Sequence, residues 1–369
     1  KLLNKQCDLS YLRQQNNTVC PNGTKFTRNK QGFLPELMEK FYDERKAWKK
    51  KMIEYQVERE ACKDAKRRRQ LDTLIKRAYN NQMVRKIALN SAYGALANQY
   101  FAFFSIDLAE AITTSGQLII QWSERTINEF MNKTLGTENE DFVIAMDTDS
   151  VYITMDKLVQ KVLPEETDKS KIINFLNKSE GMIEKVLSDG FDDLAEYTNA
   201  YQNKMEMGRE IIADRGIWTA KKRYILNVHD NEGVRLAEPK LKMMGIETAK
   251  SSTPQWVRTK LTDAFKVVMS GTEQDLWEFV ENARKEFRNL PPEEAAFPRG
   301  CKNLAQYSDP THIYGKGTPI HTRGALLYNH HLGKKNVDMR YEKIKNGEKI
   351  HFTYLTTPNP INELSLIHI

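Results

Sequence analysis

The 369-residue sequence lacks the features of a membrane protein or of a disulfide-stabilised secreted protein. No run approaches the about 18 consecutive apolar residues that a transmembrane helix needs, so no membrane partner is predicted. The four cysteines, Cys7, Cys20, Cys62 and Cys301, form no CxxC pair, which argues against a zinc site or a disulfide framework. The same cysteine usage favours a reducing compartment. An initiator Met and a charged-then-apolar leader are also missing, so we interpret the chain as a fragment.

Positive and negative charges are segregated along the chain, whose formal net charge is +7. Residues 44–86 hold 15 Lys and Arg against 6 Asp and Glu, whereas residues 134–200 hold 6 Lys against 15 Asp and Glu. A basic block followed by an acidic block favours a polyanion site beside a cation site. Two solvated helix faces would give the same charge pattern.

The periodicity of apolar residues predicts a chain that mixes helices and strands. Residues 34–63 and 71–98 have helical patterns separated by a basic tip, which indicates an antiparallel helical hairpin. Strands are expected around the sequence FVIAMDTDSVYIT and over residues 205–228. Further helices are expected over residues 107–133, 164–200 (two amphipathic helices), 251–269 and 273–289, and the remainder reads as loops and strands.

Asp147 and Asp149 lie one residue apart between apolar strands. Two carboxylates about 6 Å apart repel each other by roughly 3 kcal/mol at an effective dielectric constant of about 20, and partial burial adds a desolvation cost. A divalent cation would offset these costs, as would protonation of one carboxyl. The aspartic protease pattern Asp-Thr-Gly-Ser fits poorly because Asp149 replaces its Gly, so a two-metal site is preferred. A pair of turn or N-cap aspartates is the alternative.

Polar residues share faces on the two hairpin helices. Arg45 and Lys49 are four residues apart, and Lys86, Asn90 and Tyr93 are spaced at i, i+4 and i+7. In an antiparallel pair both faces can line one space, where three cations, an amide and a phenol suit a nucleoside triphosphate. The alternative is a solvated basic face with Tyr93 in the core.

A third motif, the basic cluster at residues 221–223, precedes Tyr224 and an apolar strand. Such a cluster can clamp a nucleic-acid backbone, although surface runs of this kind are frequent. With it, three motifs resemble those of family B DNA polymerases, in order and spacing: KIALNSAYG (86–94), DTDS (147–150) and KKRY (221–224). Longer strings such as AEPKLKMMGIETAKSSTP and HTRGALLYN resemble T-even-type phage replicative polymerases, and the resemblance covers about residues 20–362.

The resemblance implies an α+β right-hand polymerase. Residues 32–98 would form the helical-hairpin fingers, 99–247 a palm with a mixed sheet and the catalytic aspartates, and 248–363 part of the thumb. Residues 1–31 would be part of the palm or a connecting segment. Residues 364–369, LSLIHI, match the translation of a transposon mosaic-end sequence, and we interpret them as a sequencing scar.

The resemblance also implies template-directed addition of deoxynucleotides to a primer 3′-OH, assisted by two Mg²⁺ ions. Asp149 would be the main metal ligand, with Asp147 beside it. The dNTP ligands would be Arg45, Lys49, Lys86, Asn90 and Tyr93. Contacts to primer–template DNA would come from Lys221, Lys222, Arg223, Tyr224, Ser251, Ser252, Thr253, His321 and Arg323.

Several family features are missing from the sequence. The other catalytic carboxylate of the family lies in an upstream SLYPS-type motif, which does not occur here, and neither do the acidic motifs of a proofreading exonuclease. We therefore expect an internal fragment with little activity of its own, from a protein that acts in a phage replication complex in the host cytoplasm. A sliding clamp is an expected partner of the full-length protein. A non-catalytic nucleic-acid-binding protein is the alternative, and a two-metal nuclease would need additional acidic ligands.

Overall fold

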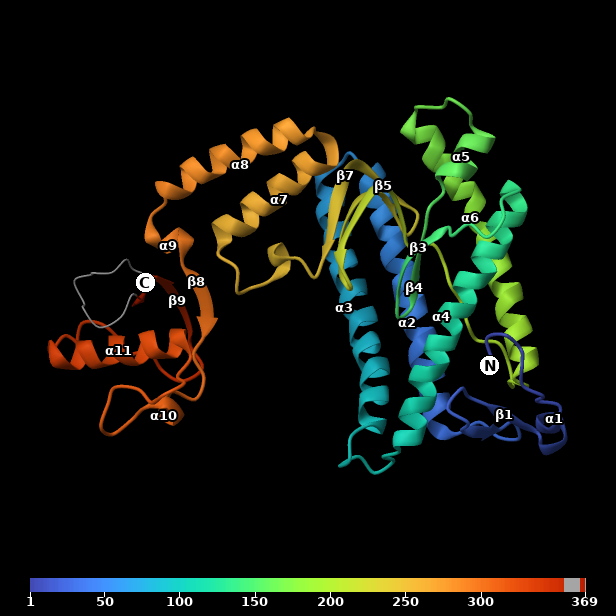
Figure 1. Ribbon diagram of the computed structural model, residues 1–369, viewed down its shortest axis with the longest axis horizontal. Helices are drawn as coiled ribbons and strands as arrows, with labels where there is room; N and C mark the ends of the chain where they lie inside the picture. Colours follow the sequence, from blue (N-terminus) through green and yellow to red (C-terminus); the bar gives the residue numbers. More distant parts are fainter. Residues whose placement is uncertain (355–365, 369) are drawn as a thin grey trace. The chain divides into compact units, whose positions relative to one another are not determined.

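The computed structural model describes residues 1–354 and 366–368, and it combines long helices with small sheets (Figure 1). This confirms the predicted α+β class. The chain divides into two compact units: Lys1–Asp214 with Val228–Lys240, and Arg215–Asn227 with Leu241–Ile369. The proposed sequencing scar at residues 364–369 lies partly outside the described residues.

Two long helices pack along each other in the first unit: α2 (Phe33–Ala61) and α3 (Ala65–Leu96). The side chain of Asp64 accepts hydrogen bonds from the backbone N–H groups of Lys66 and Arg67, which caps the start of α3. The pair is the antiparallel arrangement expected from the sequence. Lys63 and Asp64 of the basic tip connect the two helices, and the rest of the tip, residues 65–70, forms the start of α3 because the Asp64 cap begins the helix there.

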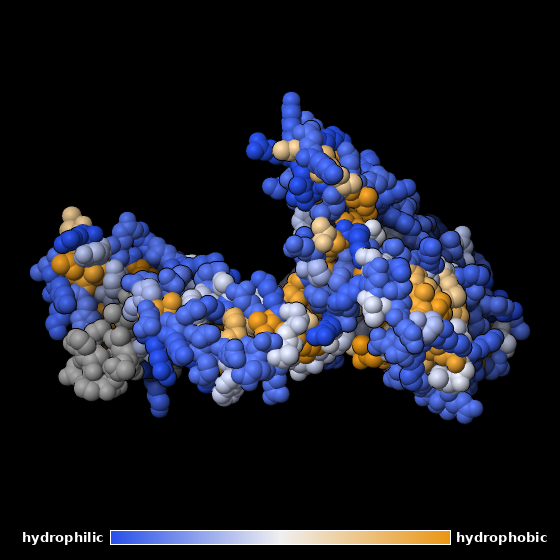
Figure 2. All heavy atoms as spheres, turned by 90° about the horizontal axis from the view of Figure 1, so that it is seen from above, coloured by the Kyte–Doolittle hydropathy of each residue, from blue (hydrophilic) through white to orange (hydrophobic). Residues whose placement is uncertain are grey.

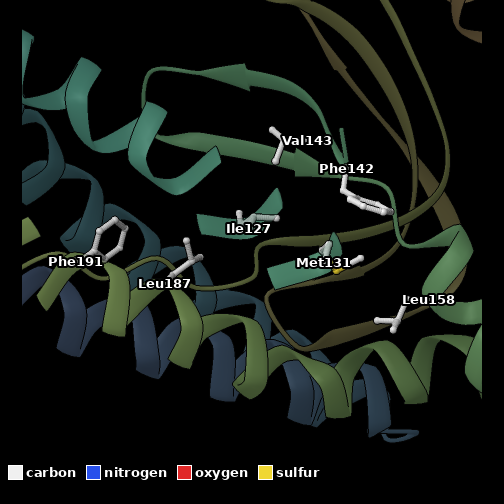
Figure 3. Close-up of a cluster of buried hydrophobic side chains, with 7 residues drawn as sticks. All are labelled: Ile127, Met131, Phe142, Val143, Leu158, Leu187 and Phe191. Carbon is white, nitrogen blue, oxygen red and sulfur yellow. The ribbon is translucent and has the colours of Figure 1, made fainter. Parts of the chain in front are cut away.

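The main hydrophobic core of the first unit lies between α4 (Ile106–Leu135), α6 (Lys169–Tyr197) and the strand β3 (Val143–Asp147). Figure 3 shows α4 side chains between those of the strand region and those of α6. The buried members of this cluster are Ile127, Met131, Phe142, Val143, Leu158, Leu187 and Phe191. Both helices have apolar stripes at helical spacing, which explains why they pair.

Helix α6 corrects the prediction of two helices within residues 164–200. The region holds one helix of 29 residues, and the second helix, α5 (Asp156–Val162), comes before it. Gly190 lies inside α6, where an added Cβ would lie 3.0 Å from Thr126 Oγ1 of α4. Its carbonyl also accepts a hydrogen bond from Trp122 Nε1 at 2.8 Å. Close packing against α4 therefore outweighs the low helix propensity of glycine.

The described strands of residues 143–244 form two separate sheets, whereas the family resemblance implied one mixed sheet. β3 pairs antiparallel with β4 (Ser150–Ile153). The three-stranded sheet has the order β5 (Ile211–Ala220), β6 (Arg223–Asn231) and β7 (Val234–Met244). Only two residues join each successive pair of these strands, so neighbours run antiparallel. The first unit begins with α1 (Tyr11–Gln15), β1 (Asn17–Val19) and β2 (Lys25–Thr27).

The second unit contains a helical part and a small sheet. The helical part comprises η1 (Glu247–Ala249), α7 (Gln255–Ser270), α8 (Glu273–Arg288) and α9 (Pro292–Ala295). The sheet has the strand order β10 (Leu366–His368), β9 (Lys349–Tyr354) and β8 (Phe297–Gly300), and it accompanies α10 (Leu304–Tyr307) and α11 (Ile320–Lys334). Helix α11 differs from the expectation of loops and strands after residue 289. It forms because Ala325 joins a buried cluster with Cys301 and Ile350.

Hydrophilic side chains cover much of the face seen from above (Figure 2). Among the described residues, none of the helices combines the length and apolar character needed to cross a bilayer.

The buried ring of Phe142 provides a test of the first core. Phe142→Ala removes a fully buried aromatic side chain and leaves a cavity, so we expect the free energy of unfolding to fall by about 3–5 kcal/mol. Urea denaturation measures the change. Tyr201→Ala, at a position 71% exposed, is the control and should change stability by no more than about 0.5 kcal/mol. Equal losses in the two variants would contradict the assignment of this core.

Candidate nucleotidyl-transfer site

Asp147 and Asp149 flank a tight turn between β3 and β4. Thr148 has a left-handed backbone with φ +49°, and the N–H of Asp149 donates to the carbonyl of Asp147 at 2.5 Å. The hydroxyl of Thr148 donates to Asp147 Oδ1 at 2.9 Å, and the hydroxyl of Ser150 donates to the Asp147 carbonyl at 3.1 Å. Asp147 is half-buried and Asp149 is exposed. The hydrogen bonds of Thr148 and Ser150 thus fix the turn and orient the carboxylate of Asp147, and the carboxylate of Asp149 follows two residues later in the same turn.

Apolar residues anchor the other end of this hairpin. Phe142 and Val143 are buried in the core formed with α4 and α6, and Val151 and Ile153 of β4 pack against the same cluster. The hairpin therefore places its apolar residues in the core and its acidic turn outside it.

The two carboxylates are a donor set that fits Mg²⁺ in part. Mg²⁺ is commonly bound by one or two carboxylates together with substrate phosphates and water, without a cage of protein ligands. Across residues 1–354 and 366–368, no cluster of three or more His, Cys, Asp or Glu side chains could hold a metal ion. Phosphate oxygens would have to complete the coordination.

The cationic residues predicted to bind nucleotide all lie on α2 and α3 of the same unit. Arg45 is half-buried, and its Nε finds no hydrogen-bond partner among the described residues. Lys49 Nζ lies 2.6 Å from Glu232 Oε1. Lys86 and Asn90 are exposed, as is Tyr93 at 41%. Tyr93 therefore lies at the surface, and the alternative that places its ring in the core is wrong.

The KKRY motif lies in the second unit and forms the turn between β5 and β6. Lys222 has φ +62°, and an added Cβ at Gly245 would lie 2.3 Å from the Lys222 carbonyl, so only glycine fits there. Arg223 Nε donates to the Gly245 carbonyl at 3.1 Å. Tyr224 is buried, with its ring centroid 6.4 Å from that of Trp218. Arg223 and Tyr224 therefore pack locally, while Lys221 is exposed.

Glu247, which begins η1, contacts this turn through Arg223, although no sequence motif identifies it. Its carboxylate accepts hydrogen bonds from Lys250 Nζ at 2.9 Å and from Arg223 Nη2 at 2.5 Å. The pKa of Glu247 is lowered from 4.5 to about 2, first by the hydrogen bond from Lys250, then by its backbone hydrogen bond and by the charges of Arg223 and Lys250.

Ser251, Ser252 and Thr253, predicted to contact DNA, lie just before α7. The two serines line a cavity of about 740 Å³. Its acidic and basic lining residues are Arg258, Glu293, Glu294, Arg299, Lys349 and His351. Four of these six are basic residue types and two are acidic, so both signs of charge line the cavity.

His321 and Arg323 lie on α11. His321 lines a hollow of about 570 Å³ with Arg299. Burial lowers the pKa of His321, and the charge of Arg299 lowers it further, so the neutral imidazole is favoured near pH 7. The guanidinium of Arg323 lies 4.6 Å from the ring centroid of Tyr314, a cation–π contact.

Comparison with known protein families matches residues 3–301 to DNA polymerase family B. The chain therefore belongs to family B of the DNA polymerases. It is 33% identical to a DNA-directed DNA polymerase of Enterobacteria phage T4 and 34% identical to one of Escherichia phage RB69, each over 93% of this chain and 43% of the relative. A DNA polymerase of Pyrococcus glycovorans is 24% identical over 93% of this chain and 36% of the relative. The chain spans less than half the length of these relatives.

The low pKa of Glu247 leads to a pH prediction. Lys250→Met removes the hydrogen bond that lowers this pKa most, so the pKa of Glu247 should rise from about 2 toward 4.5, as measured by NMR titration of the carboxyl group. Because folding lowers this pKa, the ionised group stabilises the fold above pH 4.5, and that contribution is lost as pH falls toward 2. Lys266→Met, which removes a lysine paired with Asp263, is the control. An unchanged Glu247 titration in Lys250→Met would rule out this cause.

Proposed function

We propose that this chain is the nucleotide-adding part of a phage replicative DNA polymerase, which extends a primer 3′-OH on a DNA template with dNTPs. The observation that carries the proposal is the ordered DTDS turn, which presents two neighbouring carboxylates in a chain of family B. Residues 32–98 serve as the fingers, 99–247 as the palm, 248–363 as part of the thumb, and 1–31 as part of the palm or a connection. The protein acts in the host cytoplasm, and the complete gene product binds a sliding clamp.

The carboxylates of Asp147 and Asp149 hold the metal side of the site. Two Mg²⁺ ions, when bound there, would supply Lewis-acid stabilisation for in-line attack on the α-phosphorus. Asp149 is exposed and therefore open to ligands, and we assign it as the main ligand. The Thr148 hydroxyl orients the carboxylate of Asp147, which is the second metal ligand beside Asp149.

The hairpin helices bind the incoming nucleotide. Arg45, Lys49 and Lys86 contact the triphosphate oxygens, where charge-assisted hydrogen bonds are strong. The unpartnered Nε of Arg45 supports this assignment, because a partly buried donor without an acceptor is costly until a ligand or water supplies one. Asn90 supports the pocket, and the exposed ring of Tyr93 lies against the nascent base pair.

The second unit binds the primer–template duplex without reading its sequence. Lys221 and Lys222 contact the phosphate backbone, because they occupy an exposed turn. Arg223 and Tyr224 act mainly by holding that turn in place through Glu247 and Trp218. Further backbone and minor-groove contacts come from Ser251, Ser252, Thr253, His321 and Arg323.

A non-catalytic nucleic-acid-binding protein is the second candidate. It is favoured by one observation: the described residues offer two carboxylates at the acidic turn and no larger metal-binding cluster. Catalysis by the complete gene product separates the two candidates, because a binding protein would hold duplex DNA without extending a primer.

Asp149 is the first residue to test. In the complete gene product, Asp149→Ala should lower primer extension by at least about a thousandfold, because it removes the main metal ligand. Duplex binding, measured by fluorescence anisotropy, should change little. Asp189→Ala, which removes an exposed carboxylate paired with Lys185 on α6, is the control and should extend primers normally. Normal extension by Asp149→Ala would remove this residue from the mechanism.

Lys86 tests the nucleotide site. Lys86→Ala should raise the KM for dNTP and lower kcat, with a fall in kcat/KM of about tenfold to a hundredfold for the loss of one charged hydrogen bond. Steady-state primer extension over a range of dNTP concentrations measures both constants. Lys76→Ala, an exposed lysine earlier on the same helix, should leave them unchanged. If the two variants behave alike, Lys86 does not contact the nucleotide.

A further inference from the structure

Besides packing along α3, helix α2 forms three ion pairs with residues that lie beyond α3 in the chain. The structure describes all 29 residues of this helix, and none of them is buried. Glu39 pairs with Lys204 and Lys46 pairs with Glu206, each at 2.6 Å, and Lys49 pairs with Glu232. Glu39, Lys46 and Lys49 are seven and three residues apart, so they lie near one face of the helix. Among these pairs, the one with Glu232 involves a residue proposed to bind the triphosphate.

The pair of Lys49 with Glu232 is the least exposed of the three. Its side chains are 34% and 18% exposed, whereas those of Lys46 and Glu206 are 58% and 59% exposed. Screening by water is therefore weaker at Lys49, and its interaction with Glu232 is correspondingly stronger. A triphosphate that binds Lys49 must first displace this carboxylate or share the lysine with it.

The backbone of Glu232 is in an unusual conformation for its residue type. Glu232 and Gly233 form the two-residue turn between β6 and β7, with φ values of +53° and +81°. A turn with two positive φ values favours Asn, Asp or Gly at its first position. Glutamate there costs about 1 kcal/mol or more, and such strain is often kept where the side chain has a function.

Buried contacts fix this turn in place. The N–H of Glu232 donates to the Glu210 carbonyl at 2.6 Å, and the N–H of Gly233 donates to Asp230 Oδ1 at 3.0 Å. Asp230 is only 1% exposed and is itself held by Arg209 Nη1. The turn is thus a rigid support that directs the carboxylate of Glu232 toward Lys49.

We propose that Glu232 is a positioning residue that competes with the triphosphate for Lys49. It holds the lysine in the nucleotide-free protein and releases it when a triphosphate binds, so that it lowers the affinity for nucleotide. The inference rests on the proposed function, because it needs Lys49 to bind the triphosphate. A ligand with fewer phosphates offers less charge to displace Glu232, so the same contact favours triphosphates over diphosphates.

The test uses two substitutions of Glu232 in the complete gene product. Glu232→Asn suits the positive φ and has a shorter, neutral side chain, so it should fold as well as the parent protein. Glu232→Gln keeps the length and removes the charge. Both should lower the apparent Kd for dNTP by about two- to fivefold, the range expected for release of one partly exposed ion pair. Single-turnover primer extension measures this Kd separately from the rate of chemistry.

Two controls separate the inference from the proposed function. Glu206→Gln breaks the neighbouring pair with Lys46 and should leave the Kd for dNTP unchanged. In a Lys49→Met background, which should itself raise the Kd, Glu232→Asn should have no further effect, because the competitor no longer has a target. If Lys49→Met weakens dNTP binding but both Glu232 variants bind as the parent does, the competition is refuted while the proposed function stands. If the parent protein does not extend primers at all, both fall.

Discussion

The acidic turn depends on the burial of the hairpin that carries it. Phe142 and Val143 anchor the hairpin between α4 and α6, and burial of such side chains stabilises a fold by roughly 1.5–3 kcal/mol each. This is comparable to or larger than the roughly 3 kcal/mol by which two carboxylates about 6 Å apart repel each other. The chain can therefore hold Asp147 and Asp149 together without a ligand. The repulsion that remains favours the binding of a cation.

The cations that face nucleotide in our proposal are held in a different way. Helix α2 packs along α3 without burying any residue fully, and its contacts with residues later in the chain include ion pairs, which are worth about 0.2–1 kcal/mol each when exposed. Contacts of this size exchange partners at low cost, whereas apolar packing does not. Apolar packing of the β3–β4 hairpin thus holds the acidic turn in place. The helices that carry Arg45, Lys49 and Lys86 also make polar contacts, such as that of Lys49 with Glu232, which a charged ligand can replace.

The sequence predicted those features that are encoded within a short stretch of chain. The periodicity of α2 and α3 indicated the helical pair, and the apolar flanks of DTDS indicated the strand–turn–strand that presents the aspartates. Tertiary packing decided what the sequence missed. Helix α6 continues through Gly190 because its backbone packs against Thr126, and α11 forms because Ala325 enters a buried cluster with Cys301 and Ile350. Neither contact has a local signal.

Glu232 shows most clearly what lies beyond sequence reasoning. It belongs to no motif, and its partner Lys49 lies in a helix far earlier in the chain. A glutamate at a turn reads as an ordinary solvated residue until its positive φ and its low exposure are known together. Asn would satisfy the same turn without strain, so the turn alone does not account for the glutamate. Asn and Gly lack the carboxylate that pairs with Lys49, and this ion pair links the strained backbone to the nucleotide site that we propose.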